Sequence, residues 1–275
     1  MIHWYPGHMH KATKELKKLM PQIDICIEVV DARAPDAGSN PSLHQMARDK
    51  PLIKILSKKD LADTAITKQW LSYYRGRSLA LDTLHEQKNT RKIIDLCRRQ
   101  LPNRGTLLKP IRAVIFGIPN VGKSTLINAL AGRKIAKTGN EPAVTKQLQK
   151  IEIARHFFLS DTPGIMFPSP KDEAAGFKMA AIGSIRDTAM DYELTAHYLL
   201  HYLTQHYPRL LQKRYGIDNE FDPDSETMLK TIEDRIGLKN YSLHERIVSD
   251  FRQGRLGRIS LESPDDIKND SIDAN

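Results

Sequence analysis

The sequence predicts an α/β domain, with a mostly parallel sheet covered by helices on both faces, followed by a small all-α domain. Short apolar runs with the length of buried strands alternate with helical patterns through the first part of the chain. Beyond residue 186 the strand signals stop and helical patterns follow one another. Such alternation favours parallel strands joined by helices, and the helical end favours a second domain.

The elements can be assigned in chain order from apolar periodicity and from breakers. The first half predicts a helix at 9–20, a strand at 23–30, a short helix at 42–49, a strand at 52–56, a helix at 66–74, a strand at 78–81 and a helix at 88–101. The second half predicts strands at 111–116, 149–154 and 157–160, a helix from 124, and helical patterns at 191–207, 208–215, 226–236 and 243–251. We therefore divide the chain into an α/β domain at 1–185, a helical domain at 186–262 and an acidic tail at 263–275 that we expect to be disordered.

The strongest motif is GIPNVGKS at residues 117–124, directly after the strand at 111–116. It matches the phosphate-binding pattern GxxxxGKS in full and lies between a strand and a helix, which is the context that the pattern requires. Gly122 allows backbone N–H groups to approach phosphates, and Lys123 can neutralise the β and γ oxygens. The Ser124 hydroxyl can ligate Mg²⁺. Val121 and Thr125 complete the predicted contacts of this loop with the nucleotide.

A second motif, DTPG at residues 161–164, follows the strand-like run FFLS. Open α/β sheets bind ligands at the carboxyl ends of their strands, so we expect Asp161 near the phosphates. We assign Asp161 to Mg²⁺, held through water, and the N–H of Gly164 to the γ-phosphate. In the polar loop at 136–146, Thr145 is assigned as the threonine that closes on Mg²⁺, with a plain solvated loop as the alternative.

The third motif, SKKD at residues 57–60, follows a strand-like run and reads as a guanine-recognition motif. Asp60 can accept hydrogen bonds from the N1–H and the exocyclic amine of guanine, and the stem of Lys58 can lie over the base. Adenine lacks these donors, so we expect GTP rather than ATP. Ser57 replaces the asparagine of the usual NKxD form, which leaves open whether this loop is tied to the phosphate loop. The loop that contacts sugar and base should lie near 79–83, where no known pattern matches.

The order of these motifs is unusual, because the guanine motif precedes the phosphate loop. In most GTP-binding folds the phosphate loop comes first, so the chain has the motif order of a circularly permuted P-loop GTPase. A parallel sheet tolerates such a permutation, since packing and ladder hydrogen bonds place its strands whatever their order along the chain.

Three further segments make a family resemblance specific: WYPGHM at 4–9, DARAP at 31–35 and FRQGRLGR at 251–258. With them the chain resembles, over nearly its whole length, the bacterial ribosome biogenesis GTPase A family, also called YlqF-type. The resemblance implies a GTP hydrolase that assists late assembly of the large (50S) ribosomal subunit and binds its rRNA. It also implies stimulation of hydrolysis by that subunit, contact with ribosomal proteins, and a helical domain that faces RNA.

The same resemblance supplies two catalytic hypotheses beside Lys123 and Gly164. Ras-type enzymes place a glutamine after the DxxG motif to orient water, but residue 165 is isoleucine here. The resemblance offers His8, whose imidazole can align or activate water; a histidine that only packs the amino terminus is the alternative. It also offers Asn120 as a ligand that holds K⁺ near the α and γ phosphates.

The chain carries 42 Lys and Arg against 33 Asp and Glu, a formal net charge of +9, which favours a polyanionic partner. No apolar run approaches the length of a membrane span, and the amino terminus lacks the apolar centre of a signal peptide. We therefore expect a cytoplasmic protein, with no membrane partner, that acts as a monomer. Cys26 and Cys97 show no metal-ligand spacing and read as buried side chains.

Basic residues recur through the helical end, at Arg209, Lys213, Arg214, Lys230, Arg235, Lys239, Arg246, Arg252, Arg255 and Arg258. The two glycines at 254 and 257 would let the backbone approach an RNA phosphate, and Tyr215 and Tyr241 are candidates for base stacking. A solvated helix face is the plainer interpretation of such charges. The alternative function, from a different class, is a GTP-dependent binding switch in stress signalling or membrane transport, with no ribosomal role.

Overall fold

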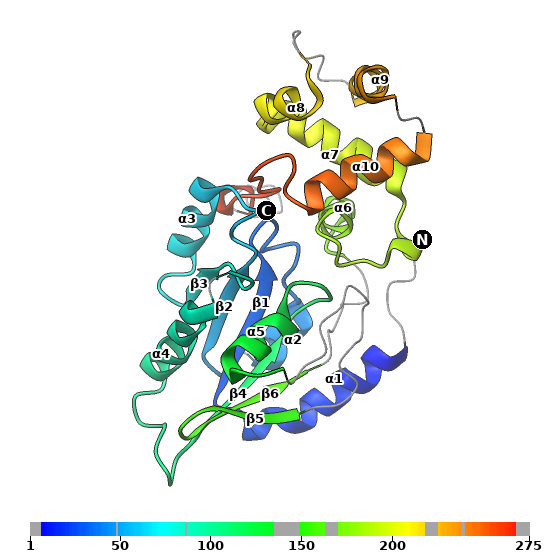
Figure 1. Cartoon of the computed structure of the whole chain (residues 1–275). Helices are drawn as coiled ribbons and strands as arrows, with labels where there is room; N and C mark the ends of the chain where they lie inside the picture. Colours follow the sequence, from blue (N-terminus) through cyan, green and yellow to red (C-terminus); the bar gives the residue numbers. More distant parts are fainter. Residues whose placement is uncertain are drawn as a thin grey trace.

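The structure, a computed structural model, describes residues 7–47, 49–85, 87–134, 149–162, 170–217, 225–237 and 240–267. It contains a twisted sheet with helices on both faces and a group of helices beyond the carboxyl ends of the central strands (Figure 1). The α/β class and the helical second region are as the sequence predicted.

The sheet has six strands in the order β3-β2-β1-β4-β6-β5. These are β1 (Ile25–Asp31), β2 (Leu52–Ser57), β3 (Ser78–Leu81), β4 (Ile111–Phe116), β5 (Gln149–Ala154) and β6 (Phe157–Asp161). All neighbouring pairs are parallel except β5 with β6. The register pairs Asp31 with Ser57 and Ile115 with Asp161, so the loops after β1, β2, β4 and β6 leave the same edge of the sheet.

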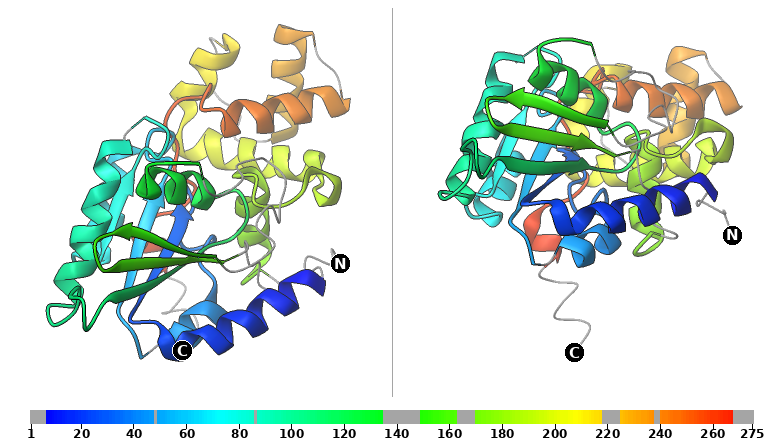
Figure 2. Two further views of the ribbon diagram at one scale, coloured as in Figure 1. Left: turned by 60° about the horizontal axis from the view of Figure 1, so that its bottom comes forward. Right: turned by 90° about the horizontal axis from the view of Figure 1, so that it is seen from below.

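Helices cover both faces of this sheet. They are α1 (Gly7–Leu19), followed by the 3-10 turn η1 (Met20–Gln22), α2 (Pro41–Ala47), α3 (Thr64–Tyr73), η2 (Gln87–Thr90), α4 (Arg91–Gln100) and α5 (Lys123–Ala131). Along β1, Ile25 and Ile27 join the core shared with α4 and α5, whereas Cys26 packs on the opposite face with α1 and α2. Figure 2 shows α1 and α5 on opposite sides of the sheet. Burial on both faces explains why these strands read as continuous apolar runs.

The helical region has its own core. Its elements are α6 (Glu173–Ala181), η3 (Asp187–Ala189), α7 (Tyr192–His206), α8 (Pro208–Tyr215), α9 (Ser225–Ile236) and α10 (Asn240–Arg252). The fully buried Leu199, Ile232 and Ile247 bring α7, α9 and α10 together. Helix α6 belongs to both cores, because Met179 packs with the sheet core and Ala181 with the helical core. None of the described helices is long and apolar enough to cross a bilayer.

The chain returns to the α/β domain after α10. The backbone N–H of Ile259 donates to the carbonyl of Leu61 at 3.0 Å, and that of Leu261 donates to the carbonyl of Arg33 at 2.7 Å. Ile267 packs beside Trp70 of α3. Residues 263–267, which we expected in a disordered tail, are therefore packed. The segment 259–267 contacts both regions, because the side chains of Ile259 and Leu261 pack in the helical core.

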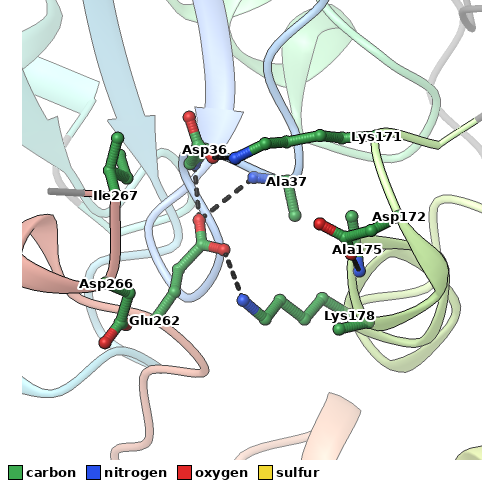
Figure 3. A pocket seen from close by; sticks show the side chains of 10 residues that line it. Asp36, Ala37, Lys171, Asp172, Ala175, Lys178, Glu262, Asp266 and Ile267 are labelled. Carbon is green, nitrogen blue, oxygen red and sulfur yellow. Dashed lines mark hydrogen bonds and ion pairs between the residues drawn. The ribbon is translucent and has the colours of Figure 1, made fainter. Parts of the chain in front are cut away.

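Glu262 fastens this returning segment. Its carboxylate accepts the backbone N–H groups of Asp36 and Ala37 and lies 3.1 Å from the ammonium of Lys178 in α6 (Figure 3). The side chain is almost fully buried. One carboxylate therefore joins the loop after β1, α6 and the carboxyl-terminal segment.

Candidate nucleotide-binding site

The loop between β4 and α5 has the backbone geometry of a phosphate-binding loop. A Cβ atom at Gly117 would lie 2.4 Å from the carbonyl oxygen of Val29, so no larger residue fits there. Gly122 has φ +90° where α5 begins, a conformation that favours glycine. Ser124 lies in the first turn of α5. The backbone N–H groups of a first turn have no acceptor within the helix, so this end of α5 is a suitable position for an anion.

Lys123 extends from this loop to the end of β6. Its ammonium lies 2.6 Å from Oδ1 of Asp161 and also contacts the carbonyl oxygen of Thr162. The Thr162 hydroxyl donates to the carbonyl of Ile115 at 2.9 Å, which holds the end of β6 against β4. Lys123, predicted to bind phosphate, and Asp161, predicted to hold Mg²⁺, therefore lie together, although they are 38 residues apart in the chain.

Ser57 makes the contact that the sequence left open. Its hydroxyl lies 2.5 Å from the carbonyl oxygen of Val121 in the phosphate loop and 2.9 Å from that of Val30. Both neighbours are acceptors, so the hydroxyl is the donor. A serine is long enough to tie the guanine motif to the phosphate loop because the end of β2 lies directly beside that loop.

Lys58 reaches Asp31, at the end of β1. Its ammonium lies 3.0 Å from Oδ2 of Asp31, and Arg33 binds the same carboxylate through Nε at 2.9 Å and Nη2 at 2.8 Å. Burial by itself raises the pKa of Asp31, but the charges of Arg33 and Lys58 outweigh burial and hold that pKa well below its usual value. Only the family resemblance drew attention to the segment 31–35, and in the structure Asp31 anchors Lys58 of the guanine motif.

Asp60 is half-buried in the turn that follows Lys58. The backbone N–H of Leu61 donates to the carbonyl of Lys58 at 3.0 Å and closes this turn. Within the part of the chain that the structure describes, no hydrogen bond or ion pair ends on the Asp60 carboxylate. Both of its oxygens can therefore accept hydrogen bonds from guanine.

The loop expected near 79–83, for which the sequence offered no matching pattern, also borders the phosphate loop. Thr83, after β3, is buried, and its Oγ1 would lie 3.5 Å from a Cβ atom at Gly122. Asp82 shapes the loop by accepting the backbone N–H of His85 at 3.0 Å. An aspartate directly after a strand, which favours such a turn, was the available signal.

Asn120 connects the phosphate loop to the helical region. It has φ +60°, and its Nδ2 donates to the carbonyl oxygen of Gly183, after α6, at 2.8 Å. The family resemblance offered Asn120 as a ligand for K⁺. Its contact with Gly183 could not be predicted from the sequence, because it depends on how α6 packs.

The glycines of the stretch 252–258 have a packing role that the sequence did not predict. A Cβ atom at Gly254 would lie 2.7 Å from Cδ2 of Leu61, and one at Gly257 would lie 3.2 Å from Cδ2 of Leu210. Side chains of the same chain therefore occupy the Cβ side of each glycine, which gives both a packing role. Their contact with an RNA phosphate stays a prediction.

Tyr215 also differs from its prediction. It is 5% exposed, and its hydroxyl lies 3.3 Å from Oδ2 of the buried Asp250. A ring in this position is not available for stacking on a base. The side chain of Tyr241 lies outside the described residues.

Most of the predicted site residues share one edge of the sheet. They are Ser57, Lys58, Asp60, Asn120, Val121, Gly122, Lys123, Ser124, Thr125 and Asp161. Thr145 and Gly164 lie outside the described residues, and His8 lies in α1 but its side chain is not among those described. The three motifs thus converge as the sequence predicted, and the flanking loops at Asp31 and Thr83 join them.

The chain is similar to known proteins over most of its length. A family model described as "50S ribosome-binding GTPase" matches residues 112–234. Ribosome biogenesis GTPase A of Priestia megaterium is 38% identical, covering 96% of this chain and 97% of that protein. The protein of the same name from Bacillus licheniformis is 37% identical, covering 97% of this chain and 100% of that protein.

A solved structure shares the fold. GNP-bound YlqF from T. maritima is 23% identical with a TM-score of 0.62, covering 92% of this chain and 98% of that one. The family itself follows from the curated relatives, which match nearly the whole chain at well over 30% identity. The chain belongs to the ribosome biogenesis GTPase A family.

Proposed function

We propose that this GTPase couples the hydrolysis of GTP to GDP and phosphate to a late step in assembly of the large ribosomal subunit, and binds that subunit through its rRNA. Membership of the family supports the broader role, a GTP hydrolase in ribosome biogenesis. The observation that carries the chemistry is the convergence of three motifs, with Ser57 2.5 Å from the carbonyl of Val121 and Lys123 2.6 Å from Asp161.

The donor set fits Mg²⁺. Hydroxyl and carboxylate oxygens are the ligands that this ion prefers, and Ser124 and Asp161 supply them beside Lys123. Thr145 is the third candidate ligand. When bound, Mg²⁺ neutralises charge on the β and γ oxygens. Asn120 is the candidate ligand for K⁺, and we expect hydrolysis to slow several-fold when Na⁺ replaces K⁺, measured as phosphate release.

For water activation we propose His8, with Lys123 and the N–H of Gly164 stabilising the phosphates. His8 lies in the first turn of α1 and belongs to the segment WYPGHM at 4–9. A His8→Ala variant should keep its affinity for GTP and lose turnover. Unchanged turnover would mean that this histidine only packs the amino terminus.

Outward-facing cations support an RNA partner. Arg209 and Lys213 on α8 and Lys230 on α9 are exposed, and no described acidic side chain pairs with them. Cations of this kind bind the phosphate backbone without reading sequence. Co-sedimentation with large ribosomal subunits, in the presence of a non-hydrolysable GTP analogue, tests the partner. We expect binding that weakens as salt rises; association with lipid vesicles instead of subunits would favour the membrane-transport alternative.

Guanine specificity has its own test at Asp60. Asp60→Asn should abolish binding of GTP and favour xanthosine triphosphate, because the amide reverses one hydrogen bond to the base. Asp63→Asn is the matched control, since Asp63 caps α3 and asparagine caps equally well. Unchanged affinity for GTP in Asp60→Asn would remove the guanine assignment.

A further inference from the structure

The guanine motif and the phosphate loop are joined by a second route, which passes through the ends of two helices outside the α/β domain. At the phosphate loop the route begins with the 2.8 Å hydrogen bond from Asn120 to Gly183. A carbonyl oxygen can only accept, so this contact fixes which way the Asn120 amide faces. The position of Gly183 thereby sets the orientation of a side chain inside the phosphate loop.

Arg252, the last residue of α10, holds the end of α6 where Gly183 lies. Its Nη2 donates to the carbonyl of Ala180 at 2.8 Å and its Nε to that of Ala181 at 3.3 Å. Its Nη1 pairs with Asp187 at 2.8 Å. A guanidinium in this position satisfies the last carbonyls of a helix and interacts favourably with the helix dipole. A Cβ atom at Gly183 would lie 3.4 Å from Nε of Arg252, so the two are in direct proximity.

The end of α10 is held in turn by the α/β domain. Nη1 of Arg33 donates to the carbonyl oxygens of Phe251 at 3.3 Å and Arg252 at 3.5 Å, and the guanidinium lies 4.9 Å from the centroid of the Phe251 ring. The remaining nitrogens of Arg33 bind Asp31, which also holds Lys58. Contacts therefore run from the guanine motif to the end of α10, then to the end of α6, and back to the phosphate loop.

We propose that Arg252 is a positioning residue for GTP hydrolysis: by fixing the end of α6 it fixes Gly183, and through Gly183 the Asn120 amide beside the phosphates. The proposal rests on GTP hydrolysis at this site and does not depend on the ribosomal partner. Arg252 makes no direct hydrogen bond or ion pair with a predicted nucleotide-binding side chain among the described residues, although its charge acts on Lys58. Its hydrogen-bonded route to the phosphate loop runs through the end of α6, Gly183 and Asn120. Displacement of a group at a reacting centre by about 1 Å can slow turnover strongly. Recognition of the base by Asp60 does not need Asn120, so kcat should change more than KM.

The test compares Arg252→Gln with Arg255→Gln in steady-state GTP hydrolysis, below the Tm of each variant. For Arg252→Gln we expect kcat to fall about tenfold, with KM for GTP within about threefold of the wild-type value. Arg255 lies in the same stretch and pairs with Asp250 at 2.5 Å, but it contacts neither α6 nor Gly183, so Arg255→Gln should retain kcat. Wild-type kcat in Arg252→Gln, or an equal loss in Arg255→Gln, overturns the proposal.

A double-mutant cycle with Asn120→Ala separates positioning from general destabilisation. If Arg252 acts through Asn120, Arg252→Gln lowers kcat in the wild-type background and has no further effect once Asn120 is alanine. If the double variant loses kcat by the product of the two single-variant factors, the two residues act independently and the proposal is contradicted. Arg252→Lys keeps the charge and a donor and should recover part of kcat; it replaces Arg252→Gln in the cycle if the glutamine variant does not fold. Absence of GTP hydrolysis in the wild-type protein would overturn both the enzymatic assignment and this proposal.

Discussion

Two groups of basic residues in the helical region serve different purposes. Arg214, Arg246 and Arg255 converge on the carboxylate of Asp250, at 2.9, 3.1 and 2.5 Å, and Asp250 is fully buried. Arg209, Lys213 and Lys230 instead face solvent and have no partner among the described acidic side chains. All six contribute equally to the net charge, yet only the second group is open to a polyanion. A count of charges in a sequence therefore overstates the surface available to RNA.

The largest effect should come from removing the common partner of the first group. Asp250→Ala leaves three guanidinium groups without their carboxylate, and we expect the free energy of unfolding to fall by about 3 kcal/mol. In a chain of this size that lowers Tm by roughly 6–12 °C, measured by calorimetry. Asp234→Ala, which removes an exposed acid on α9, is the control and should change Tm little. Equal Tm values in the two variants would mean that the Asp250 cluster is not structural.

A glycine substitution next to this cluster should have the second largest effect. Gly254→Ala adds a Cβ 2.7 Å from Leu61 at φ +70°, and we expect a loss of about 2 kcal/mol in the free energy of unfolding. Gly237→Ala has nearly the same backbone strain, at φ +68°, but nothing within 4 Å of the added atom. The difference between the two variants, measured by denaturant unfolding, isolates the contact with Leu61. No difference would leave the packing role of Gly254 unsupported.

The outward group should affect binding and leave stability unchanged. In the triple variant Arg209→Gln, Lys213→Gln, Lys230→Gln, we expect affinity for large-subunit RNA to fall about tenfold and the slope of log K against log salt to lose about two units. Tm should stay within about 1 °C of the wild-type value because these side chains are exposed. Arg255→Gln makes the opposite prediction, a lower Tm with an unchanged salt slope. If the triple variant binds RNA normally, these cations are not the RNA contact.

The smallest expected effect is a pH dependence at Asp250. Burial by itself raises its pKa, but hydrogen bonds from Arg214 and Arg255 outweigh burial and lower that pKa below the ordinary value. A depressed pKa contributes stability that is present above about pH 4 and is lost as the pH falls through the folded-state value. The difference in Tm between wild type and Asp250→Ala should therefore shrink below about pH 4. A difference that stays constant down to pH 2 would show that the charge of Asp250 does not contribute.

Local signals in the sequence were sufficient for the strands and for the three motifs. The run at 111–116 is mostly apolar because β4 is buried on both faces. The phosphate loop that follows begins with glycine because a Cβ at position 117 would lie 2.4 Å from the carbonyl oxygen of Val29. Other features left a weak local signal or none. The loop at Asp82 and Thr83 matches no pattern, and the role of Asp31 and Arg33 depends on Lys58, which lies on another strand.

The sequence by itself determined the sheet, the order of its motifs and the identity of the residues that we predict to meet a guanine nucleotide. Each of these depends on neighbours a few residues away, through periodicity, backbone freedom or hydrogen-bonding type. Only the tertiary structure decided which basic side chains pair within the chain and which face solvent. Arg246 and Arg255 lie only four and five residues from Asp250, but Arg214 reaches it from 36 residues away and Arg252 reaches α6 from 72 residues away. Pairings at such separations arise from packing, which leaves no pattern in the local sequence.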